Sequence, residues 1–176
     1  MKCINYTDDR HKVELSFETF IEAKGYCWFA SVFYNGLFRF SALECLEMKN
    51  DISVNAEFVG IFPRENNRQR LWSWIESYDE YLIFVPLCAD NITIYNIERN
   101  EFITFPIKEP ENLTVYTISY NNMAKFSTCI KRDNSIVFLP YTYPAIVVLN
   151  FETMKLVYYE QPIYDMSVYL EKYGPF

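Results

Sequence analysis

The chain carries one pattern in three similar copies, and the three copies align without a gap. They are Cys27–Met48, Leu82–Ile103 and Ile136–Val157, which begin 55 and then 54 residues apart. Self-similarity at a fixed period of roughly 20–50 residues is typical of solenoids and propellers, in which each repeat is one supersecondary unit that packs against its neighbours. The repeat therefore constrains the fold more than any other feature of the sequence.

Each repeat consists of short apolar runs separated by turn residues. In the middle repeat the runs are rich in Ile, Val, Phe, Tyr and Thr, and polar breaks such as Tyr78–Glu80 and Glu98–Asn100 separate them. This pattern is typical of antiparallel strands joined in a meander. We therefore predict four short strands in each repeat. In the first repeat they are Leu15–Phe20, Tyr26–Phe33, Gly36–Ser41 and Glu44–Met48.

Some residues recur at the same place in the repeat and predict local structure. Pro86 and Pro140 close the second strand, where the missing N–H of proline is tolerated at a strand end. Asn96 and Asn150 stand before the third turn, where an Asn side chain can accept hydrogen bonds from its own backbone. Three copies of one local geometry are therefore expected, although the residues vary.

The central strands are apolar on both faces, because Leu82–Val85, Ile136–Leu139 and Ile146–Leu149 do not alternate. A sheet with one wet face alternates, so these sheets are predicted to be covered on both sides, as radially stacked blades are. In this four-strand meander the repeats resemble generic β-propeller repeats of the kelch-like or six-bladed kind. The kelch glycine doublet and the Gly-His and Trp-Asp pairs of WD40 repeats are absent, so no specific family follows. We predict an all-β fold of three four-stranded antiparallel blades that form a partial β-propeller, with a β-sandwich as the alternative.

The repeats divide a single domain, 1–176, at about 3–57, 58–111 and 112–165, and 166–176 forms the start of a fourth unit or a closing strand. Closed propellers typically have 4–8 blades, so three repeats leave two apolar end faces. Large exposed apolar faces normally mark interfaces. We therefore expect a homo-oligomer, most simply a homodimer, in which the tail after Ile163 pairs with its own N-terminal segment or crosses to the partner.

Composition excludes several classes of protein. The net charge is −7, and no cluster of basic residues is longer than Lys131–Arg132, so no nucleic-acid partner is expected. The N-terminus does not resemble a signal peptide, and no apolar run approaches the roughly 18 residues of a membrane helix. We therefore expect a cytoplasmic protein without a membrane partner. The five cysteines are odd in number and form no CxxC pair, which favours reduced thiols over disulfides or zinc.

Candidate chemistry is sparse. The single histidine, His11, lies in a polar stretch, and the four glycines are isolated, which excludes a phosphate-cradling loop. Asp79 and Asp133 recur with the repeat, so turn structure explains them better than catalysis. Trp72 and Trp74 are expected in the core. We predict no catalytic residue, no cofactor and no metal site.

The loops between the second and third strands carry the candidate binding residues, because in a propeller these loops emerge on one face. The predicted binding rim consists of Tyr34, Asn35, Asp90, Tyr141 and Tyr143. Tyrosine at a rim provides a large contact area at low entropic cost. Two functions follow. The first is a non-catalytic interaction module that binds itself or another protein. The alternative is half of a propeller enzyme that acts on a carbohydrate or small metabolite, with its site on the axis of the assembly.

Overall fold

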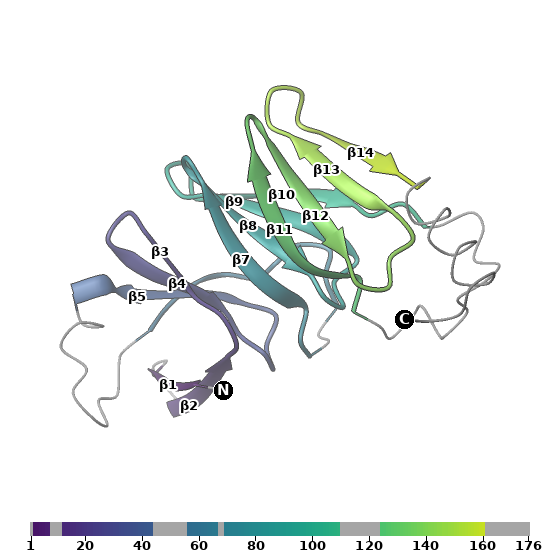
Figure 1. The fold of residues 1–176 in the computed structure, drawn as a ribbon. Helices are drawn as coiled ribbons and strands as arrows, with labels where there is room; N and C mark the ends of the chain where they lie inside the picture. Colours follow the sequence, from purple (N-terminus) through teal and green to yellow (C-terminus); the bar gives the residue numbers. More distant parts are fainter. Residues whose placement is uncertain (1, 8–11, 44–55, 67–68, 110–123, 161–176) are drawn as a thin grey trace.

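The computed structural model describes residues 2–7, 12–43, 56–66, 69–109 and 124–160. The strands form one two-stranded sheet and three four-stranded sheets, and every pairing is antiparallel (Figure 1). The predicted all-β fold with three four-stranded antiparallel sheets is confirmed. Within the described residues, no helix has the length and hydrophobicity needed to span a bilayer.

The strands follow chain order within every four-stranded sheet, so each sheet is an up-and-down meander. Sheet 1 contains β3 (Ile21–Ala23), β4 (Tyr26–Ala30), β5 (Leu37–Ser41) and β6 (Glu57–Gly60). Sheet 2 contains β7 (Trp72–Tyr78), β8 (Tyr81–Pro86), β9 (Asn91–Asn96) and β10 (Glu101–Pro106). Sheet 3 contains β11 (Phe126–Arg132), β12 (Ser135–Pro140), β13 (Ile146–Asn150) and β14 (Lys155–Tyr159). The N-terminal pair consists of β1 (Lys2–Thr7) and β2 (Lys12–Phe17).

The turns repeat with the period of the sequence. Lys24, Asp79 and Asp133 follow the first strands of sheets 1, 2 and 3, and their φ angles are 52°, 50° and 49°. A left-handed conformation is uncommon for residues other than glycine, so its recurrence identifies one turn geometry in three copies. Asn96 Oδ1 accepts hydrogen bonds from the backbone of Glu98 and Arg99, as predicted for the third turn.

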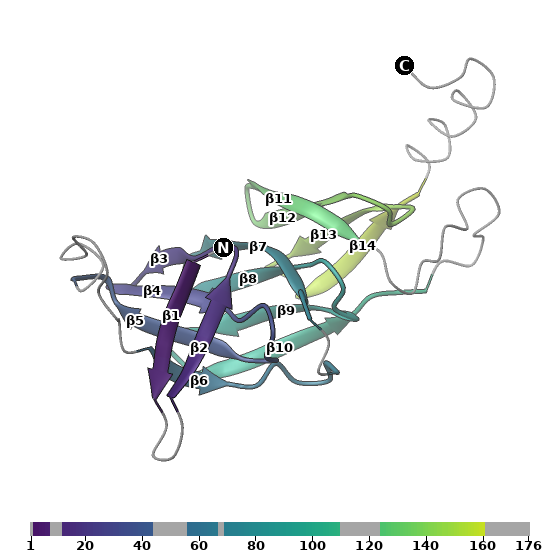
Figure 2. The same ribbon diagram turned by 90° about the horizontal axis from the view of Figure 1, so that it is seen from below.

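Successive sheets lie face to face in an arc that does not close (Figures 1 and 2). The first strands come together, because β3 contacts β7 and β7 contacts β11. This arrangement is consistent with a partial propeller. We call the face of each sheet that points toward the preceding part of the chain its front face, and the opposite face its rear face.

Sheet 2 is covered on both faces. Trp72, Phe84 and Tyr95 of sheet 2 pack against Trp28 and Leu37 of sheet 1. Every residue of β9 is buried. The absence of alternation in Leu82–Val85 is thus explained by two covered faces. Trp74 points out of this core and is 42% exposed, so the expectation that both tryptophans are core residues is wrong for Trp74.

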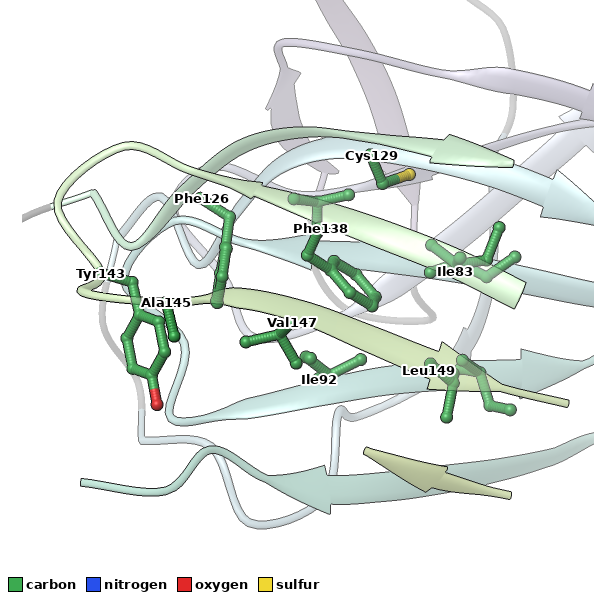
Figure 3. Close-up of a cluster of buried hydrophobic side chains, with 12 residues drawn as sticks. Ile83, Ile92, Phe126, Cys129, Phe138, Tyr143, Ala145, Val147 and Leu149 are labelled. Atoms are coloured by element: carbon green, nitrogen blue, oxygen red, sulfur yellow. The ribbon is translucent and has the colours of Figure 1, made fainter. Parts of the chain in front are cut away.

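A second core fills the space between the rear face of sheet 2 and the front face of sheet 3. Figure 3 shows Ile83 and Ile92 of sheet 2 beside Phe138, Val147 and Leu149 of sheet 3. All five side chains are fully buried. Complete burial of an aliphatic or aromatic side chain stabilises a fold by about 1.5–3 kcal/mol, so this interface holds sheet 3 in place.

The N-terminal pair covers part of the front face of sheet 1, while Phe58 at the β6 edge of that face is 46% exposed. Leu15 and Phe17 of β2 join a buried cluster with Phe29, Phe38 and Phe40. The ring centroids of Phe17 and Phe29 are 4.7 Å apart. One of the two end faces inferred from the sequence is therefore occupied by the chain itself.

Sheet 1 differs from the strands expected for the first repeat. Leu15–Phe17 belongs to β2, which pairs with β1, and the first strand of sheet 1 begins only at Ile21. The fourth strand is β6, which spans the predicted boundary between the first and second repeats, while Glu44–Met48 lies outside the described residues. Sequence similarity alone did not distinguish these segments, because each is a short apolar run. The predicted repeat boundaries themselves stay predictions.

Candidate functional site

The loops that join second and third strands gather at one end of the three sheets. We call this surface the loop end and define it as residues 31–36, 69–71, 87–90, 124–125 and 141–145. A chain of backbone hydrogen bonds crosses it: Val32 to Ser16, Arg70 to Val32, Leu87 to Leu71, Lys125 to Leu87, and Tyr141 to Lys125, naming donor before acceptor. The loops are thus tied to one another as well as to their own sheets.

These hydrogen bonds also follow the repeat. The carbonyls of residues 16, 71 and 125, which are 55 and 54 residues apart, accept from the amides of residues 32, 87 and 141, which have the same spacing. A backbone hydrogen bond that recurs in all three repeats is part of the structure that the repeats share. These bonds make the loop end a rigid platform. The residues that distinguish one loop from another are those that differ between the repeats.

Asn35 does not lie on an exposed rim. It is 8% exposed, its Nδ2 donates to the carbonyls of Phe62 and Glu65, and its Oδ1 accepts from the amide of Phe62. The carbonyls and amide that it satisfies belong to the segment after β6. A buried polar group without a partner costs about 1–3 kcal/mol, so Asn35 holds this segment against sheet 1.

Glu65 fastens the same segment to sheet 2. Its carboxylate accepts from the amide of Asp90 and from the amide and side chain of Asn91, at 2.7–2.9 Å. Burial raises the pKa of the Glu65 carboxyl above its ordinary value, against the opposite effect of the hydrogen bonds from Asp90 and Asn91. Asn35 and Asp90, two predicted rim residues, are thus brought into one network through Glu65.

Lys125 continues this network to sheet 3. Its side chain is only 9% exposed, and its Nζ lies 3.1 Å from Asp90 Oδ1 and donates to the carbonyl of Ala89. A buried ammonium group needs such partners, because the loss of hydration is costly. Asp90 is therefore an ion-pair partner within the chain.

The tyrosines of the predicted rim separate into two groups. Tyr143 is 4% exposed, packs in the core between sheets 2 and 3, and donates its hydroxyl to the carbonyl of Lys108. Tyr34 and Tyr141 are 50% and 72% exposed, and Phe33 beside Tyr34 is 45% exposed. Of the five candidates, only Tyr34 and Tyr141 present a large side chain to solvent.

A small hollow lies at the loop end between sheets 1 and 2. Its cavity volume is about 10 Å³, roughly the room that one water molecule needs. Arg70 Nη2 lies 2.7 Å from Glu18 Oε1 among its lining residues, and Trp72 also lines it. The buried indole N–H of Trp72 has no acceptor among the described residues. Cavities that enclose small molecules usually measure about 300–1,000 Å³, so the loop end is a surface rather than a deep pocket.

Sequence reasoning missed Glu65 and Lys125. Neither residue belongs to a loop between second and third strands, and both are of a type that is usually solvated. A possible signal was the position of Lys125 directly before the apolar run at Phe126, where the equivalent residue of the second repeat is Leu71.

Little conventional chemistry is brought together. In the described part of the chain, no three His, Cys, Asp or Glu side chains form a group that could hold a metal ion. Asp79 and Asp133 occupy left-handed turn positions, as their recurrence suggested. His11 lies outside the described residues. Cys129 is a buried free thiol, Cys27 is buried and Cys88 is partly exposed.

Solved structures share this fold. One is described as the extracellular domain of a hybrid two-component system from B. thetaiotaomicron, with a TM-score of 0.51 and 13% identity over 90% of this chain and 17% of that chain. Another is described as the extracellular domain of a one-component system from the same organism, with a TM-score of 0.50 and 13% identity over 91% of this chain and 17% of that chain. No family model and no curated protein matches the sequence.

At this level of identity the comparison shows the fold alone. The chain spans 17% of the length of the solved chains that it matches. Both of those domains are extracellular, which contradicts the predicted cytoplasmic location. That prediction is wrong because it relied on the N-terminal sequence, which does not report where a domain of this fold works.

Proposed function

We propose that this chain is a non-catalytic interaction module of the β-propeller type that binds another protein through its loop end. One observation carries the proposal: Tyr34 and Tyr141 are 50% and 72% exposed on loops that backbone hydrogen bonds hold in place. Aromatic side chains contribute most of the energy at many interfaces, and a rigid platform lowers the entropy lost on binding.

The breadth of the site favours a protein over a small molecule. Tyr34 belongs to the β4–β5 loop of sheet 1 and Tyr141 to the β12–β13 loop of sheet 3, with sheet 2 between them. The hollow between sheets 1 and 2 is small, and Asn35, Glu65 and Lys125 are engaged in hydrogen bonds within the chain. A partner with a broad surface can contact both tyrosines.

The shared fold supports a role in recognition outside the cytoplasm. Two solved structures of this fold are described as extracellular domains, one of a hybrid two-component system and one of a one-component system, and this chain spans 17% of each. We therefore place the proposed binding event outside the cytoplasm. Self-association, the other partner expected from the sequence, stays a prediction.

The test is photo-crosslinking in the cells that make the protein. A benzophenone amino acid replaces Tyr34 or Tyr141, and Arg99 serves as the control because it is exposed at the opposite end of sheet 2, in the β9–β10 turn. We expect one protein adduct shared by the Tyr34 and Tyr141 positions and absent from Arg99. The purified partner should bind the Tyr34→Ala/Tyr141→Ala variant at least about 30-fold more weakly than the natural chain. An adduct equally strong at Arg99, or unchanged affinity of the double variant, would overturn the proposal.

A further inference from the structure

The indole N–H of Trp72 is a buried hydrogen-bond donor that no acceptor satisfies in the described part of the chain. Trp72 is 7% exposed, its ring packs against Phe62 and Phe84, and it lines the hollow at the loop end. The indole N–H of Trp28, by contrast, donates to the carbonyl of Ala23 at 2.9 Å. Buried polar groups in native proteins nearly always have a partner, so the Trp72 donor calls for an acceptor from outside the chain.

Other groups that line the hollow also have hydrogen-bond donors to offer. Ser31 Oγ accepts from the amides of Phe33 and Tyr34 at 3.3 and 3.2 Å, which uses both lone pairs of the hydroxyl and leaves its proton for a further acceptor. The guanidinium of Arg70 has five N–H donors, and its Nη2 alone lies against Glu18 Oε1. The hollow therefore suits a ligand atom that accepts hydrogen bonds.

Size and charge narrow the choice of ligand. The cavity volume of about 10 Å³ admits one atom of the size of a water oxygen. Glu18 already neutralises Arg70, and the chain carries a net charge of −7, so a neutral acceptor is favoured over a second anion. The neutral acceptor that a protein surface presents most often is the carbonyl oxygen of an amide, from the backbone or from Asn and Gln.

The hollow lies beside one of the two exposed tyrosines. Ser31 and Tyr34 belong to the same loop, and the amide of Tyr34 donates to Ser31 Oγ. The amide of Arg70 donates to the carbonyl of Val32 at 2.8 Å, which fixes the two sides of the hollow relative to each other. A partner that covers Tyr34 therefore also shields the mouth of the hollow from water. Binding would be weakened if the Trp72 donor were left unpaired in that interface.

We propose that the partner bound at the loop end inserts one amide carbonyl oxygen into this hollow, where the oxygen accepts hydrogen bonds from the indole N–H of Trp72 and the guanidinium of Arg70. This inference rests on the proposed function, because it names the chemical group by which that partner is recognised. Trp72 then determines specificity: a protein that presents an apolar side chain at the same place leaves a buried donor unpaired and binds more weakly.

The first test needs no partner and uses the full natural chain. The probe is N-methylacetamide, and the readout is the NMR signal of each of the three indole N–H groups, assigned by Trp→Phe substitution. We expect a saturable shift for Trp72 and none for Trp28, whose N–H is already bonded, while the 42% exposed Trp74 reports the bulk effect of the amide. An unchanged Trp72 signal would show that water alone occupies the hollow and would overturn the proposal. A larger shift with sodium acetate at equal ionic strength would overturn the assignment to a neutral carbonyl.

The second test uses the partner captured by crosslinking. Trp72→Phe keeps an aromatic ring but removes the N–H, and it should weaken binding of that partner at least about 5-fold. Trp74→Phe is the matched control and should bind as the natural chain does, because Trp74 does not line the hollow. Melting temperatures confirm that both variants fold. Unchanged affinity of Trp72→Phe would overturn this inference, while a loss in the Tyr34→Ala/Tyr141→Ala variant would still support the proposed function.

Discussion

Lys125 is a single residue on which the junction of sheets 2 and 3 depends. We expect Lys125→Met to lower the free energy of unfolding by about 1–3 kcal/mol, because the carbonyl of Ala89 loses its buried donor and Asp90 loses its cation. Asp90 is 48% exposed, so water compensates its carboxylate in part. Urea denaturation measures the change.

Lys131→Met is the matched control for that substitution. Lys131 also pairs with a carboxylate, Glu76, at 3.2 Å, but its side chain is 49% exposed. Exposed ion pairs contribute about 0–1 kcal/mol, so this variant should unfold close to the natural chain. Equal losses for the two variants would show that burial of the Lys125 ammonium has no special role.

Cys129 provides a second test at the scale of one residue. Burial raises the pKa of its thiol to about 12, with a further contribution from the carboxylate of Glu76. Only about one molecule in 10,000 then carries the thiolate at pH 8, and the thiolate is the reactive form. We expect iodoacetamide to label the partly exposed Cys88 long before Cys129 in the native protein, as peptide mapping would reveal. Similar rates in the folded chain would contradict this burial.

At the scale of elements, the strands and turns that repeat were predictable and those that do not were missed. Pro86 closes β8 and Asn96 organises the third turn, because these effects are local and independent of distant contacts. The predicted boundary after residue 57 cuts through β6, because Phe58 pairs with Phe38 only through tertiary structure. Periodicity identifies strands, but it does not decide which sheet a strand at a repeat boundary joins.

The segment after β6 makes a pH-dependent attachment through Glu65. The pKa of the Glu65 carboxyl is higher in the folded state than its value of 4.5 in the unfolded chain, so ionisation of this group lowers the stability of the fold. The loss is absent below pH 4.5 and grows as the pH rises toward the folded-state pKa. Above the folded-state pKa the loss is constant. Glu65→Gln mimics the neutral acid. We therefore expect the stability of the variant relative to the natural chain to increase between pH 4 and pH 7, measured by urea denaturation. A difference that is the same at both pH values would show that Glu65 does not titrate in this way.

At the scale of the whole molecule, the sequence predicted an unfinished array but not which end is open. The repeat count required two end faces, and the contacts of Leu15 and Phe17 show that β2 covers one of them. The candidate site was predictable only in part. Tyr34 and Tyr141 are exposed as expected of a rim, whereas Asn35 is buried, because its partners at Phe62 and Glu65 are brought to it by the tertiary fold.

The covered end leads to a prediction about assembly. Leu15 is 1% exposed against the front face of sheet 1, and a carboxylate at this position cannot stay buried there without a partner. We expect Leu15→Asp to free this front face, which can then accept the rear face of sheet 3 from another copy. Such a contact joins two different surfaces, so it can propagate from copy to copy. Light scattering should show a mass that increases with concentration, with circular dichroism confirming that the sheets persist. Val148 lies on the rear face of sheet 3, between Val137 and Val157. Adding Val148→Lys to the variant should therefore return the mass to that of the natural chain. Aggregation that persists in the double variant would indicate unfolding and would contradict assembly through these two faces.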